Sequence, residues 1–574
     1  MADNDFKYKK KKSSKGKVIA ILLAILAVGI AVAWMVTDRY YIESKERHSP
    51  EDYFKLENMA PNKGIIVING EVADTKCHMV NGVGYLPIEY VDRDINSRFY
   101  SDKETDGILY TTGKGTISFT AGSNSYTDEN GAVVSEANPP VIKDTDRYYI
   151  SADFVQKYSD ITAASYTDPD RVVINADKEW DAARVVEDAP VRYYAGIKSD
   201  IITDVAKDDV VKVLEQEGDK WTKVYTADGF TGYIKSEKLS GIEKQSTQAA
   251  DADTFTHLTI DTPVTLSWFH VTNKDANQNY DEHTKNVKGL DVICPTWYSF
   301  ADNKGTINDF SDAALVEKMH AAGYKVWPVV NDFTNKVDIK ELLSSKSMRD
   351  RMIERLVSDA NAFKYDGINV DFETITNDSS IDFLQFLREL SLACHKNNLV
   401  VSVDNYPPKR YNFFYDVTEQ SYYADYIVLM NYDEHFAGSE EIGSVSSMGF
   451  FKENIEDALT HVPAERLINA MPFYTRLWGQ NSSGKIVSSE ALDMKTTQET
   501  IEKNNAKVTW DEAAGQNVAT YEKTNINYSV WVEDGTSIKM RLDESKKNKL
   551  GGVGFWRLGY ETEDIWKFIQ EYKK

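Results

Sequence analysis

The chain has 574 residues, more than one hydrophobic core usually serves, so we expect several domains. Its 42% hydrophobic and 27% charged residues are typical of folded soluble domains and exclude both wholesale disorder and a polytopic membrane protein. The net charge is −24, but residues 1 to 17 carry seven lysines against Asp3 and Asp5, or +5, which leaves −29 for the remainder. Because an acidic body repels polyphosphate, nucleic acid is not expected as a partner.

The cysteines and histidines show no spacing typical of a metal site. Cys77, Cys294 and Cys394 cannot form a complete disulfide framework, and we expect buried thiols. His270 and His435 lie near predicted strand ends without a ligand pattern, so a hydrogen-bonding role is expected for them. The sequence therefore predicts no metal and no cofactor.

Residues 18 to 36 form an uncharged apolar run, VIAILLAILAVGIAVAWMV. At ~1.5 Å per residue this run can cross roughly 30 Å of hydrocarbon. A cleaved signal peptide is the alternative, but its apolar region is shorter, and the bulky Trp34, Met35 and Val36 are unlike a cleavage site. We expect a cytoplasmic basic tail (1–17), a transmembrane helix through the lipid bilayer (18–36), a juxtamembrane stretch (37–61) and an extracellular remainder, since lysines favour the cytoplasmic side.

Residues 62 to 187 contain short β-rich runs such as GIIVING, GILYTTG and RVVINAD, separated by Gly, Asn and Asp turns. These runs predict strands of a small β-rich domain. The segments YLPIEYV and YYISADFV resemble the stalk modules, similar to copper amine oxidase N-terminal domains, that occur in bacterial surface proteins. No copper site is implied, because no histidine cluster accompanies them.

Residues 188 to 241 form another run of predicted short strands, with Trp221, Asp228, Gly229, Gly232 and Tyr233 at turn and strand positions. This segment resembles a bacterial Src-homology-3-like (SH3-like) barrel. Such a module binds cell-wall peptide or positions a neighbour, and an inert spacer is an equally open interpretation. Residues 242 to 256 are polar and aperiodic, which predicts a linker.

From residue 257 to 574 the pattern changes to alternating strands and helices. Residues 348 to 363 illustrate a helix, with apolar side chains recurring on one face. Eight strands are predicted, at 265–271, 290–300, 325–333, 365–373, 399–407, 426–434, 467–478 and 551–559. We therefore predict a multidomain chain with a C-terminal α/β (β/α)8 TIM barrel, preceded by small β-rich domains and an N-terminal transmembrane helix.

The fourth predicted strand, YDGINVDFE, carries the strongest chemical signal. Because strand side chains alternate, Asn369, Asp371 and Glu373 share one face, with same-face neighbours about 7 Å apart. Carboxylates pointing into a barrel interior are costly unless paired, so an ion-paired structural cluster is the alternative to catalysis. Glu373 lies at the C-terminal end of the strand, where barrel enzymes place catalytic groups, which favours an active site.

This strand resembles the DGxDxDxE signature of glycoside hydrolase family 18. Asp366, Gly367, Asp371 and Glu373 match the signature, and Asn369 departs from it. The family also carries a Met-x-Tyr-Asp element on its sixth strand and a tryptophan on its last strand. Residues 430 to 433 (MNYD) and Trp556 stand in those places. The segments VLMNYDEH, PFYTRLW and WRLGYE look closest to the spore-cortex and cell-wall N-acetylglucosaminidase branch.

The resemblance implies a retaining, substrate-assisted glycosidase acting on a 2-acetamido sugar. Glu373 would be the proton donor, Asp371 would orient the acetamide, and Tyr432 would bind the acetamide oxygen. Catalysis needs a raised pKa for Glu373, which burial and the nearby Asp371 would supply. Candidate substrate-binding residues are Asn369, Met430, Asp433, Tyr474, Arg476, Trp297, Trp531 and Trp556, although any single aromatic residue is more often part of a core.

Asn369 replaces the inner carboxylate of the signature. With a neutral neighbour, Asp371 suffers less like-charge repulsion, so we expect Asn369→Asp to move the acid limb of the pH–rate profile. An unchanged profile would discard this idea.

Other functions stay open. The expected substrate is a polysaccharide such as peptidoglycan or a cortex-like glycan. The same-class alternative is a chitinase acting on chitin. The alternatives from other classes are a lectin-like barrel that binds glycan without cleaving it, which typically lacks the acid, and a structural envelope protein with a vestigial barrel.

Overall fold

The computed structural model describes residues 15–56, 59–247, 255–260, 263–334 and 336–574. Their contacts divide the chain into one compact unit of residues 1–97 and 139–252 and a second of residues 98–138 and 253–574. Residues 1–14 of the expected cytoplasmic tail and 248–254 of the expected linker lie outside the described residues. Each unit is described by itself below.

Helix α1 (Lys15–Tyr41) contains the apolar run and extends it at both ends. None of its side chains is buried, and among the described residues it is the helix long and apolar enough to cross a membrane. Backbone hydrogen bonds hold the segment that follows α1. The N–H of Ser44 donates to Ile197 O at 2.8 Å, and that of His48 donates to Ile201 O at 2.9 Å. A short helix, α2 (Pro50–Tyr53), is capped by Ser49.

The first unit holds two seven-stranded sheets. In the first, Asn69–Gly70 and Asn81–Gly82 form two of the hairpin turns, with positive φ at both positions of each, as expected of Asn-Gly pairs. Its strand order is β11-β12-β1-β2-β3-β10-β9. The strands are β1 (Lys63–Ile68), β2 (Glu71–Val80), β3 (Val83–Pro87), β9 (Val141–Asp144), β10 (Arg147–Ser151), β11 (Thr162–Tyr166) and β12 (Arg171–Asn175), with helices α3 (Ile88–Asp94) and α4 (Ala152–Lys157).

The second sheet of this unit has the order β15-β14-β18-β17-β16-β13-β19. Its strands are β13 (Glu179–Arg184), β14 (Ala189–Arg192), β15 (Ile201–Val205), β16 (Val210–Glu217), β17 (Trp221–Tyr225), β18 (Thr231–Lys235) and β19 (Glu243–Ser246). Strand β19 lies within the segment expected to be a linker and pairs antiparallel with β13. A polar composition therefore did not prevent this segment from joining a sheet edge.

The second unit contains a closed ring of parallel strands, which confirms the predicted barrel. The third strand is interrupted at Trp327–Pro328: its first half pairs with β21 and its second half with β26, so the ring closes through both halves. The strands are β20 (Val264–Phe269), β21 (Val292–Pro295), β24 (Lys325–Val326) with β25 (Val329–Asn331), β26 (Gly367–Asp371), β27 (Val400–Asn405), β28 (Tyr426–Met430), β29 (Leu467–Pro472) and β35 (Gly552–Trp556).

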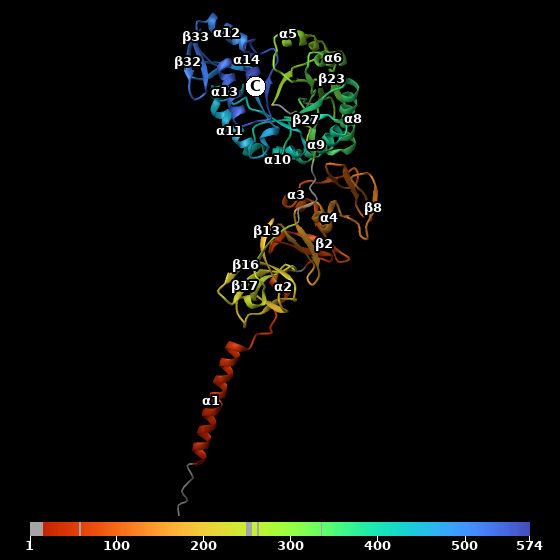
Figure 1. The fold of residues 1–574 in the computed structure, drawn as a ribbon, viewed down its shortest axis with the longest axis vertical. Helices are drawn as coiled ribbons and strands as arrows, with labels where there is room; N and C mark the ends of the chain where they lie inside the picture. The colour runs from red at the N-terminus through yellow and green to blue at the C-terminus, as the bar shows by residue number, and fades with distance from the viewer. Residues whose placement is uncertain (1–14, 57–58, 248–254, 261–262, 335) are drawn as a thin grey trace, which may run out of the picture. The chain divides into compact units, whose positions relative to one another are not determined.

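Helices surround this ring (Figure 1). Several begin at side-chain caps: Asp312 caps α6, Ser447 caps α11, and Asp534 caps α13 with a capping box. The helices are α5 (Tyr280–Thr284), α6 (Ala313–Ala321), α7 (Ile339–Ser344), α8 (Lys346–Phe363), α9 (Ser380–His395), α10 (Val417–Tyr423), α11 (Met448–Ala458), α13 (Gly535–Lys547) and α14 (Ile565–Tyr572). The predicted apolar face of α8 is buried at Met352, Leu356 and Ala360.

Strand alternation separates two cores. Ile368, Val370 and Phe372 belong to the large cluster between strands and helices, as the sequence predicts. A second cluster fills the interior of the ring, where Trp268 and Trp327 are buried and Tyr432 and Trp556 pack against it. The polar face of β26 therefore faces this interior.

Residues 98–138 form a five-stranded sheet that packs on the barrel rather than completing the first unit. The strands are β4 (Phe99–Asp102), β5 (Gly107–Thr111), β6 (Thr116–Thr120), β7 (Ser125–Thr127) and β8 (Val133–Ser135). Arg349 of α8 is 0% exposed and binds Glu389 at 2.8 Å and Asp102 of β4 at 3.3 Å. Arg388 and Arg98 likewise share Glu419. These buried ion pairs attach the small sheet to the barrel helices.

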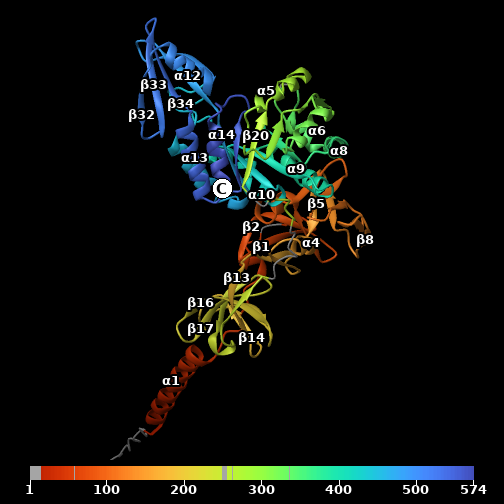
Figure 2. The same ribbon diagram turned by 45° about the horizontal axis from the view of Figure 1, so that its top comes forward.

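A second insertion lies between β29 and β35. The segment predicted as one strand at 467–478 is two, because β29 ends at Pro472 and the next strand enters another sheet. That sheet has the order β31-β30-β34-β33-β32 and extends away from the ring with helix α12 (Figure 2). Its members are β30 (Tyr474–Gln480), β31 (Ile486–Asp493), α12 (Met494–Lys503), β32 (Lys507–Asp511), β33 (Gln516–Lys523) and β34 (Ile526–Val532). Similarly, β22 (Tyr298–Phe300) leaves the second barrel strand to pair with β23 (Ile307–Asp309).

Candidate active site

Asn369 lies in the middle of β26 and is 0% exposed. Its side-chain oxygen accepts a hydrogen bond from Trp268 Nε1 at 3.0 Å. Its amide nitrogen donates to Ser402 Oγ at 2.9 Å and to Asp404 Oδ1 at 2.8 Å. With its amide bonded on both sides inside the barrel, Asn369 has no surface to offer a substrate. The prediction that it binds substrate is therefore wrong.

Asp371 ends β26 and is 4% exposed. Its Oδ1 is buried and has no hydrogen-bond partner among the described residues. Burial raises the pKa of Asp371 well above its usual range, and the neighbouring charges of Asp404, Glu373 and Asp332 raise it further. A buried carboxyl with an unused acceptor at the C-terminal end of a barrel strand is available to a ligand.

Glu373 is the second residue after the end of β26 and is half-buried. Its carboxylate accepts a hydrogen bond from the hydroxyl of Tyr406, and its backbone N–H donates to Asp332 Oδ1 at 2.8 Å. Burial raises the pKa of Glu373, the Tyr406 hydrogen bond lowers it, and the charges of Asp332 and Asp433 raise it; the net direction is upward. Asp332 and Asp433 thus act on Glu373 in addition to Asp371, whose charge interaction with Glu373 the sequence suggested.

Asp332 and Asp404 are site residues that sequence reasoning missed. Asp332 follows β25, is 2% exposed, and accepts hydrogen bonds from the backbone N–H and hydroxyl of Thr374 at 2.9 and 2.6 Å. Burial raises its pKa. Asp404 lies on β27 and is also 2% exposed. Both stand near the C-terminal ends of predicted strands, the criterion that selected Glu373, so the same test applied to every strand would have found them.

The sixth barrel strand brings Met430, Tyr432 and Asp433 to the same end of the ring. Met430 is buried, whereas Tyr432 is half-buried and packs against the interior cluster. Burial raises the pKa of Tyr432, and the charge of Asp371 is among the groups that raise it further. Asp433 is exposed, has φ +60°, and accepts a hydrogen bond from the hydroxyl of Tyr474.

The predicted tryptophans divide into two groups. Trp556 is half-buried at the end of β35, with its ring centroid 5.7 Å from that of Trp268. Trp531 is half-buried on β34, and its indole donates to Asp511 at 3.0 Å. Trp297 is 0% exposed in the outer core, and its indole donates to Asn277 at 2.9 Å. The prediction that Trp297 binds sugar is wrong, because neither face of its ring is accessible.

Arg476 lies on β30 in the insertion sheet, where Nη1 donates to Ser489 Oγ at 3.0 Å. Its Nε is buried without a hydrogen-bond partner among the described residues. No group of three or more His, Cys, Asp or Glu side chains within the described ranges is arranged to hold a metal ion.

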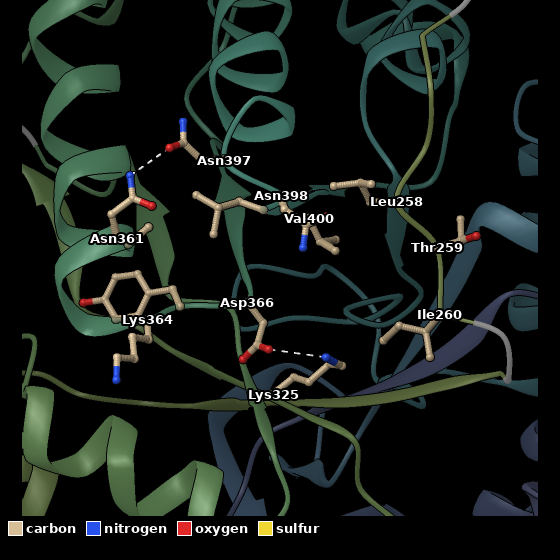
Figure 3. Close-up of a pocket in the computed structure, with 13 residues that line it drawn as sticks. Leu258, Thr259, Ile260, Lys325, Asn361, Lys364, Asp366, Asn397, Asn398 and Val400 are labelled. Atoms are coloured by element: carbon tan, nitrogen blue, oxygen red, sulfur yellow. Dashed lines mark hydrogen bonds and ion pairs between the residues drawn. The ribbon is translucent and has the colours of Figure 1, made fainter.

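Asp366, the first residue of the DGxDxDxE pattern, lies at the opposite end of the ring. Its carboxylate binds His320 at 2.9 Å and Lys325 at 3.3 Å and accepts the backbone N–H of Val326. It lines a pocket of about 600 Å³ together with Leu258, Asn361 and Val400 (Figure 3). This pocket lies at the N-terminal ends of the strands, the face that barrels use for stability, so it is not the catalytic site.

A parallel eight-stranded barrel with a half-buried glutamic acid and a buried aspartic acid at the C-terminal end of one strand has the arrangement of a barrel enzyme that acts by acid catalysis, as glycosidases do. The sequence profile of glycosyl hydrolases family 18 matches residues 230–561. The chain therefore belongs to glycosyl hydrolase family 18 and is a glycosidase. The profiles of the copper amine oxidase N-terminal domain and of the bacterial SH3 domain match residues 67–173 and 187–240, which confirms both accessory resemblances.

Several bacterial proteins are similar to this chain. Bacillus subtilis (strain 168) YvbX, described as an uncharacterized glycosylase, is 25% identical over 310 residues, or 52% of this chain and 88% of that protein. The cortical fragment-lytic enzyme of the same strain is 25% identical over 237 residues, or 40% of this chain and 55% of that protein, so the chain spans about half of that relative's length. The solved spore cortex-lytic enzyme SleL of Bacillus megaterium QM B1551 is 18% identical, with 55% of this chain and 75% of that chain covered and a TM-score of 0.48.

Proposed function

We propose that this chain is a membrane-anchored, extracellular glycosidase that cleaves N-acetylglucosamine-containing glycans of the bacterial wall with retention of configuration. Glu373 is the general acid, Asp371 binds the acetamide N–H of the substrate, and Tyr432 binds the acetamide oxygen. The observation that carries the proposal is the pairing of a half-buried, raised-pKa Glu373 with a buried Asp371 that has an unused oxygen.

The geometry of these two acids favours a substrate-assisted reaction. They come from one face of one strand, about 7 Å apart, so both approach a sugar from the same side. A retaining enzyme with a carboxylate nucleophile needs two carboxyl groups that flank the bond, about 5 Å apart. An inverting enzyme likewise needs its two carboxyl groups on opposite faces of the sugar, so the nucleophile that remains for two acids on one side is the acetamide oxygen of the substrate itself.

The proposed reaction has two steps. Glu373 gives its proton to the glycosidic oxygen while the acetamide oxygen attacks the anomeric carbon, and the bond to the leaving group breaks. Asp371 binds the acetamide N–H, which becomes more acidic as positive charge develops on the ring that forms. Water then attacks the anomeric carbon, the bond to the acetamide oxygen breaks, and Glu373 takes a proton from the attacking water. The raised pKa keeps Glu373 protonated for the first step.

Peptidoglycan or a cortex-like glycan is the preferred substrate class. A relative is named a cortical fragment-lytic enzyme, and helix α1 would hold the barrel close to the cell's own wall. Chitin is the second candidate, since the class V chitinase CHIT5 of Lotus japonicus is 23% identical over 266 residues. The presence of Glu373 favours catalysis over a lectin-like function.

The test uses the full chain in detergent micelles, incubated in parallel with peptidoglycan, spore cortex and chitin, followed by sizing of the products. We expect new reducing ends from peptidoglycan or cortex with wild-type protein and none with Glu373→Gln. Cleavage of chitin alone would select the second candidate. Binding to glycan without turnover by wild-type protein would select the lectin-like alternative.

The anchor is tested separately. We expect the chain to remain with membranes after washing with high salt and with alkaline carbonate, and protease added to intact protoplasts to digest the barrel. A soluble, shortened chain in the medium would mean that the apolar run is a cleaved signal. Protection from protease would mean that the orientation is reversed.

A further inference from the structure

Arg557 is a basic residue at the catalytic end of the barrel that the proposed reaction does not use. Strands β20 and β35 are parallel neighbours, with Ser267 opposite Phe555. His270 directly follows β20 and Arg557 directly follows β35, so both stand where the C-terminal ends of these strands meet. The ring centroid of His270 lies 5.9 Å from that of Trp556. Arg557 and His270 therefore both adjoin the proposed sugar platform.

The guanidinium of Arg557 is held in place by one neighbour and keeps donors for another. Its Cζ lies over the ring of Tyr560, 4.0 Å from the centroid, and Nη2 donates to the Tyr560 hydroxyl at 2.7 Å. The side chain is half-buried, and no carboxylate pairs with it in the described part of the chain. Because a guanidinium presents several N–H groups in one plane, most of its donors remain for a ligand. This planar fork matches a carboxylate, which it binds through two parallel hydrogen bonds.

Two imidazoles accompany this guanidinium. Nδ1 of His270 and Nδ1 of His283 are buried and have no hydrogen-bond partner among the described residues. The His283 ring packs on Gly559, because a methyl group added there would come within 2.8 Å of it. Burial lowers the pKa of both histidines, and the charge of the nearby Arg557 lowers it further. Arg557 therefore supplies the permanent positive charge of the cluster.

The acids near the cluster do not neutralise this charge. Glu282 on α5 raises the pKa of His283, but by less than burial and Arg557 lower it. Glu561 accepts the backbone N–H of Gly559 at 2.9 Å, and burial raises its pKa to about 7. The carboxyl groups of the reaction centre, by contrast, repel an anionic ligand. An anionic group of the substrate is therefore best accommodated at Arg557.

We propose that Arg557 and His270 form a carboxylate-binding subsite for the N-acetylmuramic acid unit that adjoins the N-acetylglucosamine over Trp556. This inference rests on the proposed function and narrows its substrate class. Wall glycan alternates the two sugars, and its muramic unit carries a lactyl carboxyl group, either free or extended by a peptide with carboxyl groups of its own. Chitin carries neither. The subsite therefore selects wall glycan over chitin.

The test measures binding by calorimetry to the full chain in detergent micelles, in the non-cleaving Glu373→Gln background. The ligands are an alternating tetrasaccharide of N-acetylglucosamine and N-acetylmuramic acid, the same tetrasaccharide with its carboxyls capped as methylamides, and chitotetraose. We expect Arg557→Met to weaken binding of the charged tetrasaccharide about 10-fold or more, and binding of the other two less than about 2-fold. His270→Phe keeps the aromatic contact and should weaken only the charged ligand, about 3-fold.

Two control variants separate the subsite from general effects. Arg351→Met removes the same charge from the exposed face of α8, and Tyr560→Phe removes the hydrogen bond to Arg557 but keeps its charge. Both should bind the charged tetrasaccharide within about 2-fold of the background protein. A further ligand, with the lactyl groups extended by L-alanyl-D-isoglutamate, identifies the source of the carboxylate. Dependence on Arg557 there supports a peptide carboxyl as ligand, and dependence on the unextended ligand alone supports the lactyl carboxyl.

Equal weakening of charged and neutral ligands by Arg557→Met, or no weakening at all, would overturn the proposal. If Arg557→Met does not fold, judged by circular dichroism, Arg557→Lys decides. It keeps the charge without the planar fork, so it should lose part of the affinity for the charged tetrasaccharide and none for chitotetraose.

Failure of the proposed function is distinguishable from failure of this inference, because binding is measured without turnover. A wild-type chain that cleaves no glycan would end the proposed function, while affinity that depends on the carboxylate and on Arg557 would still support the subsite. Conversely, hydrolysis of peptidoglycan together with equal affinity for the charged and capped tetrasaccharides would overturn this inference alone.

Discussion

The hydroxyl of Tyr406, in the loop after β27, donates a hydrogen bond to the carboxylate of Glu373, two residues after the end of β26. Tyr406 is 38% exposed, so this contact lies where the site meets solvent. It lowers the pKa of Glu373 against the larger, upward effect of burial. Tyr406 therefore helps set the pH at which the general acid loses its proton.

The first prediction concerns this hydrogen bond. In Tyr406→Phe the pKa of Glu373 should rise, because the carboxylate loses a donor. The alkaline limb of kcat/KM, where a protonated Glu373 is lost, should move to higher pH by about one unit. Tyr411→Phe is the matched control, since Tyr411 is 77% exposed nearby in the chain. A limb that stays in place, or moves down, would contradict the assignment of Glu373 as the acid.

The second prediction concerns Glu373, the proposed general acid. Glu373→Gln should lower kcat on a peptidoglycan fragment by about 10²–10⁴-fold, the usual contribution of a general acid. Binding should persist, because the amide has the same shape. Calorimetric titration with a non-cleaved N-acetylglucosamine oligomer checks the affinity. A variant that keeps wild-type kcat would indicate a different acid or a vestigial barrel.

Trp556 is expected to contribute mainly to substrate binding. Trp556→Ala should raise KM roughly 30-fold, about 2 kcal/mol, if a sugar packs on the indole as on a buried aromatic anchor. Trp510→Ala in the insertion sheet is the control, because Trp510 is 44% exposed and away from the barrel strands. Equal effects in both variants would show that Trp556 does not form a sugar subsite.

The small sheet of residues 98–138 is expected to stabilise the barrel. Arg349→Met leaves the buried carboxylates Glu389 and Asp102 without their partner, which should cost about 3–5 kcal/mol of unfolding free energy. Arg351→Met on the exposed face of α8 should cost less than about 1 kcal/mol. Urea unfolding followed by tryptophan fluorescence compares them. Coinciding midpoints would mean that this interface adds no stability.

Asp366, the first residue of the DGxDxDxE pattern, lies at the end of the barrel opposite Glu373, its last residue. Because its partners His320 and Lys325 lie at the N-terminal ends of the strands, Asp366→Asn should leave the pH profile of kcat/KM unchanged. We expect only a loss of stability of about 1 kcal/mol. A shifted pH limb would link the two ends of the barrel in a way that this arrangement does not explain.

The sequence alone determined the barrel and the position of Glu373. Both follow from local periodicity: alternation along residues 367–373 fixes which side chains face inward, and parallel strand direction fixes which end is catalytic. The apolar run of α1 is equally local. Hairpin turns at Asn69–Gly70 and Asn81–Gly82 follow from residues that tolerate positive φ.

Only the tertiary structure decided which residues become neighbours across strands. The bond between Asn369 and Asp404 joins positions on different strands, and no periodicity within either strand encodes their lateral register. The same holds for Tyr406 beside Glu373 and for Asp102 beside Arg349. Trp297 illustrates the converse: its position near the end of a predicted strand suggested a sugar platform, but the chain turns there and buries the ring. Packing between distant segments, which a linear pattern does not contain, set the partners of every carboxyl in the site.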